Sequence, residues 1–198
     1  MISEKDNAEP SNASAASPPP PLESRVHSAS RDDLVRVAAD AALTEDLALA
    51  LLKRADLPPE VLEQVSKNGN ALKFRKVRVA LVSHPHTPRH VSVPLARQFY
   101  SFDLLKVALS PSVPADVKAA ADELLIARLK TITLGERLSL ARRASGGVAG
   151  SLLLDSETRV MQSALQNPRL TEAVVIQAVL RPQASAAFIQ AVARAFLI

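Results

Sequence analysis

Residues 164–174 read ALQNPRLTEAV, and a related pattern recurs along the chain. Each copy has the apolar end of a helix, a proline within a few residues, a small or apolar residue, a capping residue and an apolar residue three positions later. A proline followed by a helix-capping residue is typical of a tight corner between two helices. The other copies are ALVSHPHTPRHV at 80–91, ALSPSVPADV at 108–117, VLRPQASAAF at 179–188 and a looser one, ADLPPEV, at 55–61.

The spacing of these corners predicts a repeat protein. Pro85, Pro111, Pro168 and Pro182 are separated by 26, 57 and 14 residues. Those separations are close to one, two and one-half times a helix-pair unit of roughly 28 residues. A single pair of this kind cannot bury its apolar face alone and must stack on its neighbours. We therefore predict an all-α fold, a right-handed α-solenoid of about twelve short helices.

Capping residues and prolines locate the helix starts in this prediction. Thr133 and Glu136 form the pattern of a capping box, and Pro94 falls inside the helix that begins after Pro88. In a helix over 71–82 we expect Phe74, Val77 and Leu81 to define the buried face. The helix over 171–180 is apolar almost all the way round, so we expect it to be buried from several sides. The predicted starts are Ser30, Thr44, Leu57, Asn70, Pro88, Ser101, Pro114, Thr133, Gly147, Ser156, Thr171 and Ser185.

The repeated corner resembles bacterial HEAT-like and leucine-rich-repeat-variant helical arrays. The stretch LDSETRV at 154–160, with an acidic residue ahead of Arg159 and Val160, is similar to a stretch found in HEAT units. The resemblance covers roughly residues 43–192. It implies a scaffold that binds other macromolecules, and families of this kind bind very different partners.

The chain divides into two parts by composition. Residues 1–29 are dominated by Ser, Ala, Asn and Pro and include four consecutive prolines at 18–21, so we expect a disordered tail. Residues 30–198 form the predicted α-helical repeat domain. The N-terminus is polar and acidic without the apolar region of a signal peptide, and we expect a cytoplasmic protein.

The overall composition excludes several classes of protein. The 198 residues are 47% hydrophobic, 22% charged and only 3% aromatic, with no cysteine. The absence of cysteine excludes a disulfide scaffold, a thiolate metal site and thiol chemistry. So few aromatics argue against a β-sandwich or barrel. No apolar run approaches the ~18 residues of a membrane span, so we expect none.

Charge is distributed unevenly along the chain. Residues 1–63 carry a net charge of −6 and residues 64–198 a net charge of +10, with no acidic residue between Gln64 and Phe102. Such a segment attracts anionic partners. We predict a protein partner with an acidic surface that binds at the basic segment 67–97; a solvated helix face is the alternative interpretation. The predicted partner-binding residues are Lys73, Arg75, Lys76, Arg78, Arg89, His90 and Arg97.

The same residues support an alternative function, a nucleic-acid-associated protein that contacts phosphates. Stacking aromatics are almost absent from the sequence, which makes this the less favoured reading. His84, His86 and His90 are the only candidate metal cluster, and we expect them to be loop histidines rather than zinc ligands. The glycines of GGVAG at 146–150 predict a turn between helices rather than a phosphate loop.

No catalytic signature is present, so we expect neither an enzyme nor a cofactor. The chain ends in an apolar stretch that includes Phe188, Phe196 and Ile198. Because terminal repeats need a polar outer face, these three residues predict self-association, in the form of a homodimer through the C-terminal helix. Folding of this end back onto helix 171–180 is the alternative. The leading prediction is a non-enzymatic scaffold that mediates protein–protein interaction.

Overall fold

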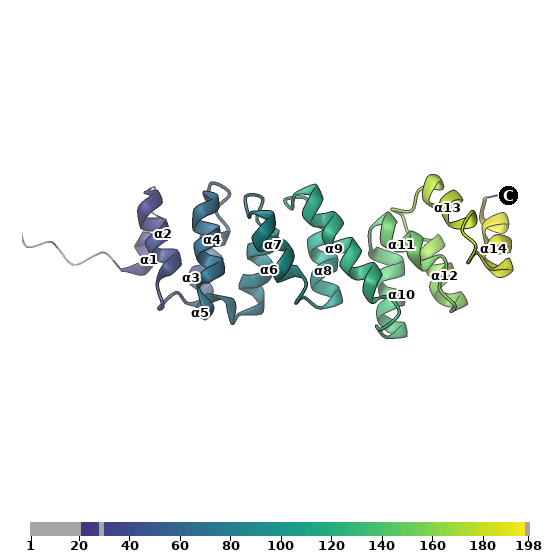
Figure 1. The fold of residues 1–198 in the computed structure, drawn as a ribbon, viewed down its shortest axis with the longest axis horizontal. Helices are drawn as coiled ribbons and strands as arrows, with labels where there is room; N and C mark the ends of the chain where they lie inside the picture. The colour runs from purple at the N-terminus through teal and green to yellow at the C-terminus, as the bar shows by residue number, and fades with distance from the viewer. Residues whose placement is uncertain (1–20, 28–29, 197–198) are drawn as a thin grey trace, which may run out of the picture.

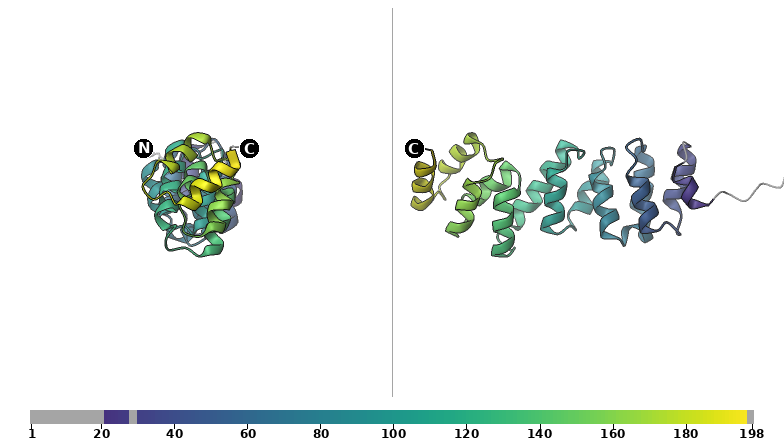
Figure 2. Two further views of the ribbon diagram at one scale, coloured as in Figure 1. Left: turned by 90° about the vertical axis from the view of Figure 1, so that its right-hand side faces the viewer. Right: turned by 180° about the vertical axis from the view of Figure 1, so that it is seen from behind.

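The protein is a row of short helices. The computed structural model describes residues 21–27 and 30–196, and within these ranges it contains fourteen α-helices and no strand. The helices follow one another along the long axis in chain order, so that the two ends of the chain lie at opposite ends of the molecule (Figure 1). The view along that axis shows a compact cross-section, and the view from behind shows the same elongated row (Figure 2).

The helices form two rows that contact each other. In the first row, α3 contacts α6, α6 contacts α8, and α10 contacts α12, which in turn contacts α14. In the second row, α2 contacts α4, and α7, α9, α11 and α13 contact one another in that order. The first row consists of α3 (Glu45–Leu52), α6 (Arg75–Ser83), α8 (Ser101–Leu109), α10 (Leu134–Arg143), α12 (Thr158–Leu165) and α14 (Ala186–Phe196). The second consists of α2 (Arg31–Ala39), α4 (Pro59–Lys67), α7 (Arg89–Ala96), α9 (Ala115–Arg128), α11 (Gly146–Leu152) and α13 (Glu172–Val179); α1 (Leu22–Arg25) and α5 (Gly69–Leu72) are single turns.

The predicted helix starts are confirmed. Each of the twelve lies within two residues of an observed helix N-terminus. Ser30 and Thr44 accept hydrogen bonds from backbone amides three residues later, as N-cap residues do. Thr133 and Glu136 form the predicted capping box. Pro94 lies inside α7, where it replaces a backbone donor.

The predicted helix over 71–82 is wrong, because the chain breaks at Phe74. α5 ends at Leu72, and α6 begins at Arg75 after an extended residue at position 74. Phe74 therefore lies at the start of α6 with its side chain 37% exposed, whereas Val77 and Leu81 are buried as expected. No glycine or proline marks this break.

The expected burial of helix 171–180 on all sides is also wrong. Only Val175 and Ala178 of α13 are buried, while Ile176 is 51% and Leu180 78% exposed. α13 lies close to the C-terminal end of the row and contacts α11 on one side (Figure 1). Its other sides lack the neighbours that helices in the middle of the row have.

The helical part begins before residue 30. Leu22–Arg25 form α1, and Val26 is completely buried. Arg54 holds this segment in place, since its Nη1 donates to the carbonyl of Val26 at 3.0 Å. Residues 1–20, including three of the four consecutive prolines, lie outside the described residues.

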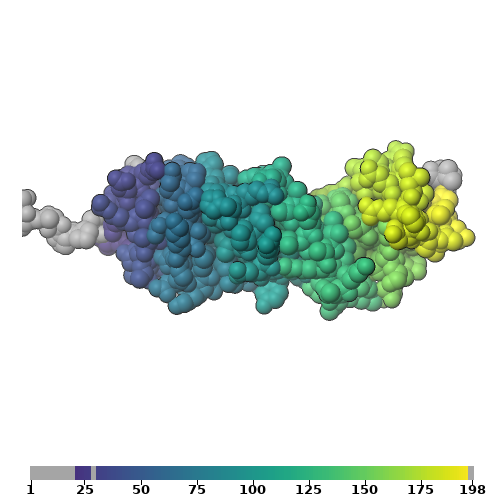
Figure 3. Space-filling view, in the orientation of Figure 1, coloured from purple at the N-terminus to yellow at the C-terminus, as the bar shows by residue number. Residues whose placement is uncertain are grey.

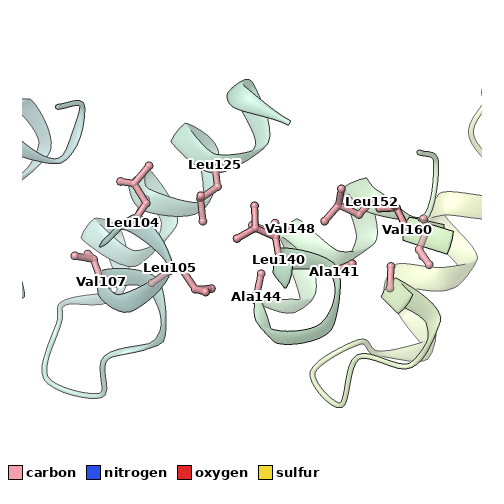
Figure 4. Packing of buried hydrophobic residues seen from close by; sticks show 14 of the residues in the cluster. Leu104, Leu105, Val107, Leu125, Leu140, Ala141, Ala144, Val148, Leu152 and Val160 are labelled. Carbon is pink, nitrogen blue, oxygen red and sulfur yellow. The ribbon is translucent and has the colours of Figure 1, made fainter. Parts of the chain in front are cut away.

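The core is a chain of Leu, Val and Ala side chains between the two rows. One cluster extends from Val26 to Val91 and a second from Val82 to Phe188, and the half-buried Leu95 packs against both. Figure 4 shows the second cluster, in which Leu125 of α9 and Val148 of α11 come from successive units. Burying a Leu or Val side chain contributes ~1.5–3 kcal/mol, so contacts between helices that are far apart in the sequence supply much of the stability.

Side chains also tie each unit to the corner of the unit before it. Between Val26 and Arg128 these bonds join residues 28 to 31 positions apart, whereas Asn167 and Arg169 reach back 23 to 26 positions to Ala141, Arg143 and Ala144. His84 and Ser112 reach back at one edge of the row, and Asn68 and Arg128 at the other. The bonds to preceding carbonyls are Arg54 to Val26, His84 to Arg54, His86 to Leu57, Ser112 to Ser83, Asn68 to Ala38 and Asp40, Asn70 to Ala41, and Arg128 to Arg97 and Phe99.

Candidate protein-binding surface

The predicted basic segment spans α6 and α7, in different rows of the molecule. On α6, the Arg75 guanidinium binds the Asp103 carboxylate of α8 through two hydrogen bonds of 2.7 and 2.8 Å. The Lys76 Nζ lies 3.6 Å from the Glu45 carboxylate of α3. Both carboxylates come from neighbouring helices of the first row.

Two further predicted residues have partners in the second row. The Arg89 guanidinium of α7 lies 3.1 Å from the Asp116 carboxylate of α9. On the other side of α7, the His90 Nε2 lies 3.4 Å from the Glu63 carboxylate of α4. The segment has no acidic residue of its own, yet stacking supplies carboxylates from units 27 to 31 residues away. The positive charge of this segment is therefore partly compensated in the fold.

The remaining predicted residues have different surroundings. The Lys73 Nζ donates to the Asn70 side chain at 2.8 Å. Arg78 is half-buried, and its Nε has no hydrogen-bond partner. Arg97 is exposed, and its backbone carbonyl accepts a bond from Arg128. The seven predicted residues thus do not form one continuous surface.

The pair of Arg75 and Asp103 is the most buried contact among these ion pairs. The Asp103 side chain is only 4% exposed, while that of Arg75 is 54% exposed. The hydrogen bonds to Asp103 and its negative charge raise the pKa of the Arg75 guanidinium. In the more exposed pair, the hydrogen bond from Arg89 lowers the pKa of Asp116. Arg75 is consequently held in one place on the surface of α6.

Three exposed aromatic residues lie next to Arg75 or its partner Asp103 along the chain, since Phe74 precedes Arg75, and Tyr100 and Phe102 precede Asp103. Tyr100 is 71%, Phe102 39% and Phe74 37% exposed. The Arg75 Cζ lies 5.4 Å from the centre of the Tyr100 ring, a cation–π distance. We call Phe74, Arg75, Tyr100 and Phe102 the aromatic edge. It belongs to the units around α6 and α8, which occupy the middle of the elongated surface (Figure 3).

The aromatic edge was not predicted from the sequence. Phe74 was expected on a buried helix face, and the scarcity of aromatics argued against nucleic-acid stacking. Half of the six aromatics in the chain lie here, because Phe74 and Tyr100 are the residues immediately before two neighbouring helices of the first row. The sequence does contain a signal for this edge: Phe74 and Tyr100 are 26 residues apart and each directly precedes a helix.

A groove lies beside the aromatic edge, between α6 and α8. Its volume is about 400 Å³. Lys76 and Lys106 are the lysines along it; Lys76 lies near the Glu45 carboxylate of α3, whereas no ion pair involves Lys106 among the described residues. The lining residues are Arg75, Lys76, Val79, Ala80, Asp103 and Lys106.

The three histidines of the candidate metal cluster are occupied by other contacts. The His84 Nδ1 accepts from the backbone amide of His86 at 3.2 Å, so its Nε2 carries the proton and donates to the Arg54 carbonyl at 2.7 Å. The His86 Nδ1 lies 3.0 Å from the Leu57 carbonyl. Within the described ranges, no three His, Asp or Glu side chains are placed to hold a metal ion.

The predicted self-association residues divide between the core and the end of the chain. Phe188 is 1% exposed and packs in the core of its own chain rather than on its surface. Phe196 ends α14, but its side chain, like the whole of Ile198, lies outside the described residues. The exposed apolar side chains of this end are instead Ile176, Leu180 and Ile189.

Comparisons with known proteins add no relative to this picture. No family model matches the chain, and neither does any curated protein or solved structure at a significant level. None of the helices in the described ranges has the length and apolarity required to cross a membrane. The longest, α9, has 14 residues and so measures about 21 Å, against about 30 Å of bilayer core.

Proposed function

We propose that this chain is a non-enzymatic scaffold that binds an acidic segment of another protein at the aromatic edge. The observation that carries the proposal is the exposed Tyr100 ring against Arg75, which Asp103 holds in place, with exposed Phe74 and Phe102 directly beside these two residues in the chain. Lys73 precedes Phe74 in the chain, and Lys76 and Lys106 line the adjoining groove, where Glu45 partly offsets the charge of Lys76.

The composition of the edge is that of a protein-binding centre. Tyr, Phe and Arg are enriched among interface residues, and Tyr and Arg among those that contribute most of the binding energy. The two hydrogen bonds to Asp103 fix the Arg75 side chain before a partner arrives, which reduces the entropy lost on binding. The lysines at the rim favour an acidic partner and accelerate its approach.

The architecture that we propose for this scaffold is a right-handed α-solenoid of HEAT-like units. Contacts between successive helices within each row support it, as do side-chain bonds between residues 23 to 31 positions apart. Such arrays present long surfaces suited to extended partners. The aromatic edge would then lie where two consecutive units meet.

A nucleic-acid partner is the second candidate, and the aromatic edge is the observation that favours it. Exposed rings beside lysines are the features that stack and hold single-stranded bases. However, the central arginine already binds Asp103, which leaves only lysines for phosphates. Salt separates the two candidates, since binding to single strands weakens with a slope near 0.7 per phosphate contacted.

Photocrosslinking from inside the native cell tests the proposal. A photoreactive phenylalanine analogue replaces Tyr100 in the full chain, and in a matched control it replaces Leu180, which is equally exposed but distant along the row. We expect one protein to crosslink from position 100 and not from position 180. The crosslinked peptide of that protein should be acidic.

Two variants complete the design. Tyr100→Ser with Phe102→Ser should reduce capture of the crosslinked protein roughly tenfold, whereas Leu180→Ser should leave it unchanged. Circular dichroism confirms that both remain helical. Crosslinking to nucleic acid that nuclease removes would favour the second candidate. Equal crosslinking from both positions would overturn the aromatic edge as the binding site.

A further inference from the structure

A groove between α10 and α12 contains three arginines and no carboxylate. Its volume is about 640 Å³, within the range of ligand-binding sites. It shares no residue with the aromatic edge, so the two sites can be tested separately. The lining residues are Leu138, Ser139, Arg142 and Arg143 from α10, and Arg159, Gln162, Ser163 and Gln166 from α12 and its C-cap.

The two walls of the groove run in the same direction. Asn167, just after α12, donates to the carbonyls of Ala141 at 2.8 Å and Ala144 at 3.1 Å, so the C-terminal ends of α10 and α12 lie side by side. On α12, Arg159, Gln162 and Gln166 are spaced by three and four residues and therefore share one face. On α10, residues 138 and 139 lie four and three positions before residue 142, so these three also share one face.

The positive charges stand at both ends of the groove. Arg142 and Arg143 are in the last turn of α10, next to Gln166, whereas Arg159 is in the first turn of α12. Position 166 is seven residues after position 159, which corresponds to about 10 Å along the helix. A ligand that contacts both ends must therefore carry two anionic groups about that far apart.

These arginines differ from the cations of α6 and α7. Arg75 and Arg89 form ion pairs across successive units, but no ion pair involves Arg142, Arg143 or Arg159 among the described residues. All three side chains belong to exposed residues. Stacking has supplied no carboxylate here, and the guanidinium groups remain accessible to a ligand.

We propose that this groove binds an extended acidic peptide whose carboxylates are three residues apart. In a polyproline II conformation, residues i and i+3 lie on one face and about 9 Å apart, close to the rise of about 10 Å along α12 from position 159 to position 166. A guanidinium binds a carboxylate through two parallel hydrogen bonds. Between the ends, Gln162 and Ser139 offer donors and acceptors to the peptide backbone.

Two other ligands fit the groove less well. A single phosphate group reaches the arginines at only one end. Nucleic acid would bind without base stacking, because no aromatic residue lines the groove. The acidic peptide uses both ends and the polar floor.

Fluorescence anisotropy with labelled peptides tests the proposal on the full chain. The probe is the hexapeptide PEPPEP, with glutamates three apart in a polyproline II frame. One twin has glutamines in place of the glutamates, and another, PPEEPP, has the same charge with adjacent glutamates. At ~0.15 M salt we expect PEPPEP to bind roughly tenfold more tightly than the glutamine twin and roughly fivefold more tightly than PPEEPP.

Charge-matched variants locate the binding. The triple variant Arg142→Gln, Arg143→Gln and Arg159→Gln should lose PEPPEP binding roughly tenfold or more. The control triple variant removes the same charge at exposed positions outside the groove, with Lys53→Gln, Lys67→Gln and Arg194→Gln, and should bind within about twofold of wild type. Replacing the three groove arginines with lysine keeps the charge but removes the planar guanidinium that binds a carboxylate through two hydrogen bonds. We therefore expect an intermediate loss of PEPPEP affinity.

Several results would overturn the proposal. Equal affinity for PEPPEP and PPEEPP would mean that the groove does not distinguish the spacing of the glutamates. An equal loss of PEPPEP affinity in the control triple variant would mean that binding depends only on overall charge. No binding of PEPPEP at millimolar concentration would remove the site. Preferential binding of a single-stranded oligonucleotide, lost in the groove variant, would make it a nucleic-acid site. Circular dichroism checks that each variant remains folded. If the triple variant unfolds, the single variant Arg159→Gln replaces it in the binding measurement.

Discussion

Gly150 of α11 lies so close to Val174 of α13 that no side chain fits between them. A Cβ at position 150 would overlap the Val174 Cγ1. The glycine thus permits close packing between consecutive helices of the second row, and it is part of a helix rather than of the turn that the sequence predicted. Gly146 plays the same role, since its Cβ would meet the Arg169 carbonyl oxygen at 2.5 Å.

Gly150→Ala should therefore destabilise the protein, although alanine favours helices. Overpacking of a core costs ~1–3 kcal/mol, which exceeds the ~0.5–1 kcal/mol that alanine contributes to a helix. Gly147→Ala is the matched control, because the nearest atom to its Cβ is a side-chain oxygen at 3.9 Å. It should raise the free energy of unfolding. Urea denaturation measures the free energy of unfolding of both variants. A stabilising effect of Gly150→Ala would show that α11 and α13 can separate.

How much of the fold could be predicted depended on whether the signal was local. Caps and prolines act on the backbone within one turn, so Ser30, Thr44 and Thr133 located their helices correctly. The break at Phe74 has no such signal, because it depends on how α6 packs against other units. Exposure of Ile176 likewise depends on the absence of neighbours at one end of the row.

The candidate sites were less predictable for the same reason. A linear search for charge grouped residues 67–97, but stacking brought Asp103 and Asp116 from other units to Arg75 and Arg89. Arg142 and Arg159 are 17 residues apart in the sequence, and only the side-by-side packing of α10 and α12 places them in one groove. Residues that share a surface in this fold come from different helices and are far apart in the sequence.

His84 makes the stability of the protein sensitive to acid. Burial lowers its pKa below the ordinary value near 6.5, and protonation of Nδ1 would break the bond from the His86 amide. Because the folded-state pKa is the lower one, the contribution of neutral His84 is fully present above about pH 6.5. It is lost as the pH falls through the folded-state pKa.

The measurement is the free energy of unfolding of wild type and His84→Gln at pH 7.5 and pH 5.5. Wild type should lose more stability on acidification than the variant, which has no ring to titrate. His90→Gln is the control at an exposed position. Parallel losses in wild type and His84→Gln would mean that other groups determine the pH dependence.

Asp122 of α9 should have the opposite effect on the pH dependence of stability, because its ionised form destabilises the fold. One oxygen of this half-buried carboxylate has no hydrogen-bond partner, and burial raises its pKa. The folded state then binds the proton more tightly than the unfolded state, so ionised Asp122 lowers stability at neutral pH. Asp122→Asn should raise the melting temperature at pH 7, and the gain should shrink as the pH falls toward the ordinary aspartate pKa of ~3.9. A lower melting temperature at pH 7 would contradict this account.

The buried pair of Arg75 and Asp103 should matter more for stability than the exposed pair of Arg89 and Asp116. Arg75→Ala leaves the Asp103 carboxylate 4% exposed and without its hydrogen bonds, and an unsatisfied buried group costs ~1–3 kcal/mol. Arg89→Ala removes a pair whose side chains are 62% and 48% exposed, and such pairs contribute ~0–1 kcal/mol. Urea denaturation should therefore show a larger loss for Arg75→Ala. Adding Asp103→Asn to Arg75→Ala should restore part of that loss by removing the buried charge. Equal losses for the two single variants would mean that Asp103 gains water when Arg75 is absent, and the rigid arginine of the aromatic edge would need another explanation.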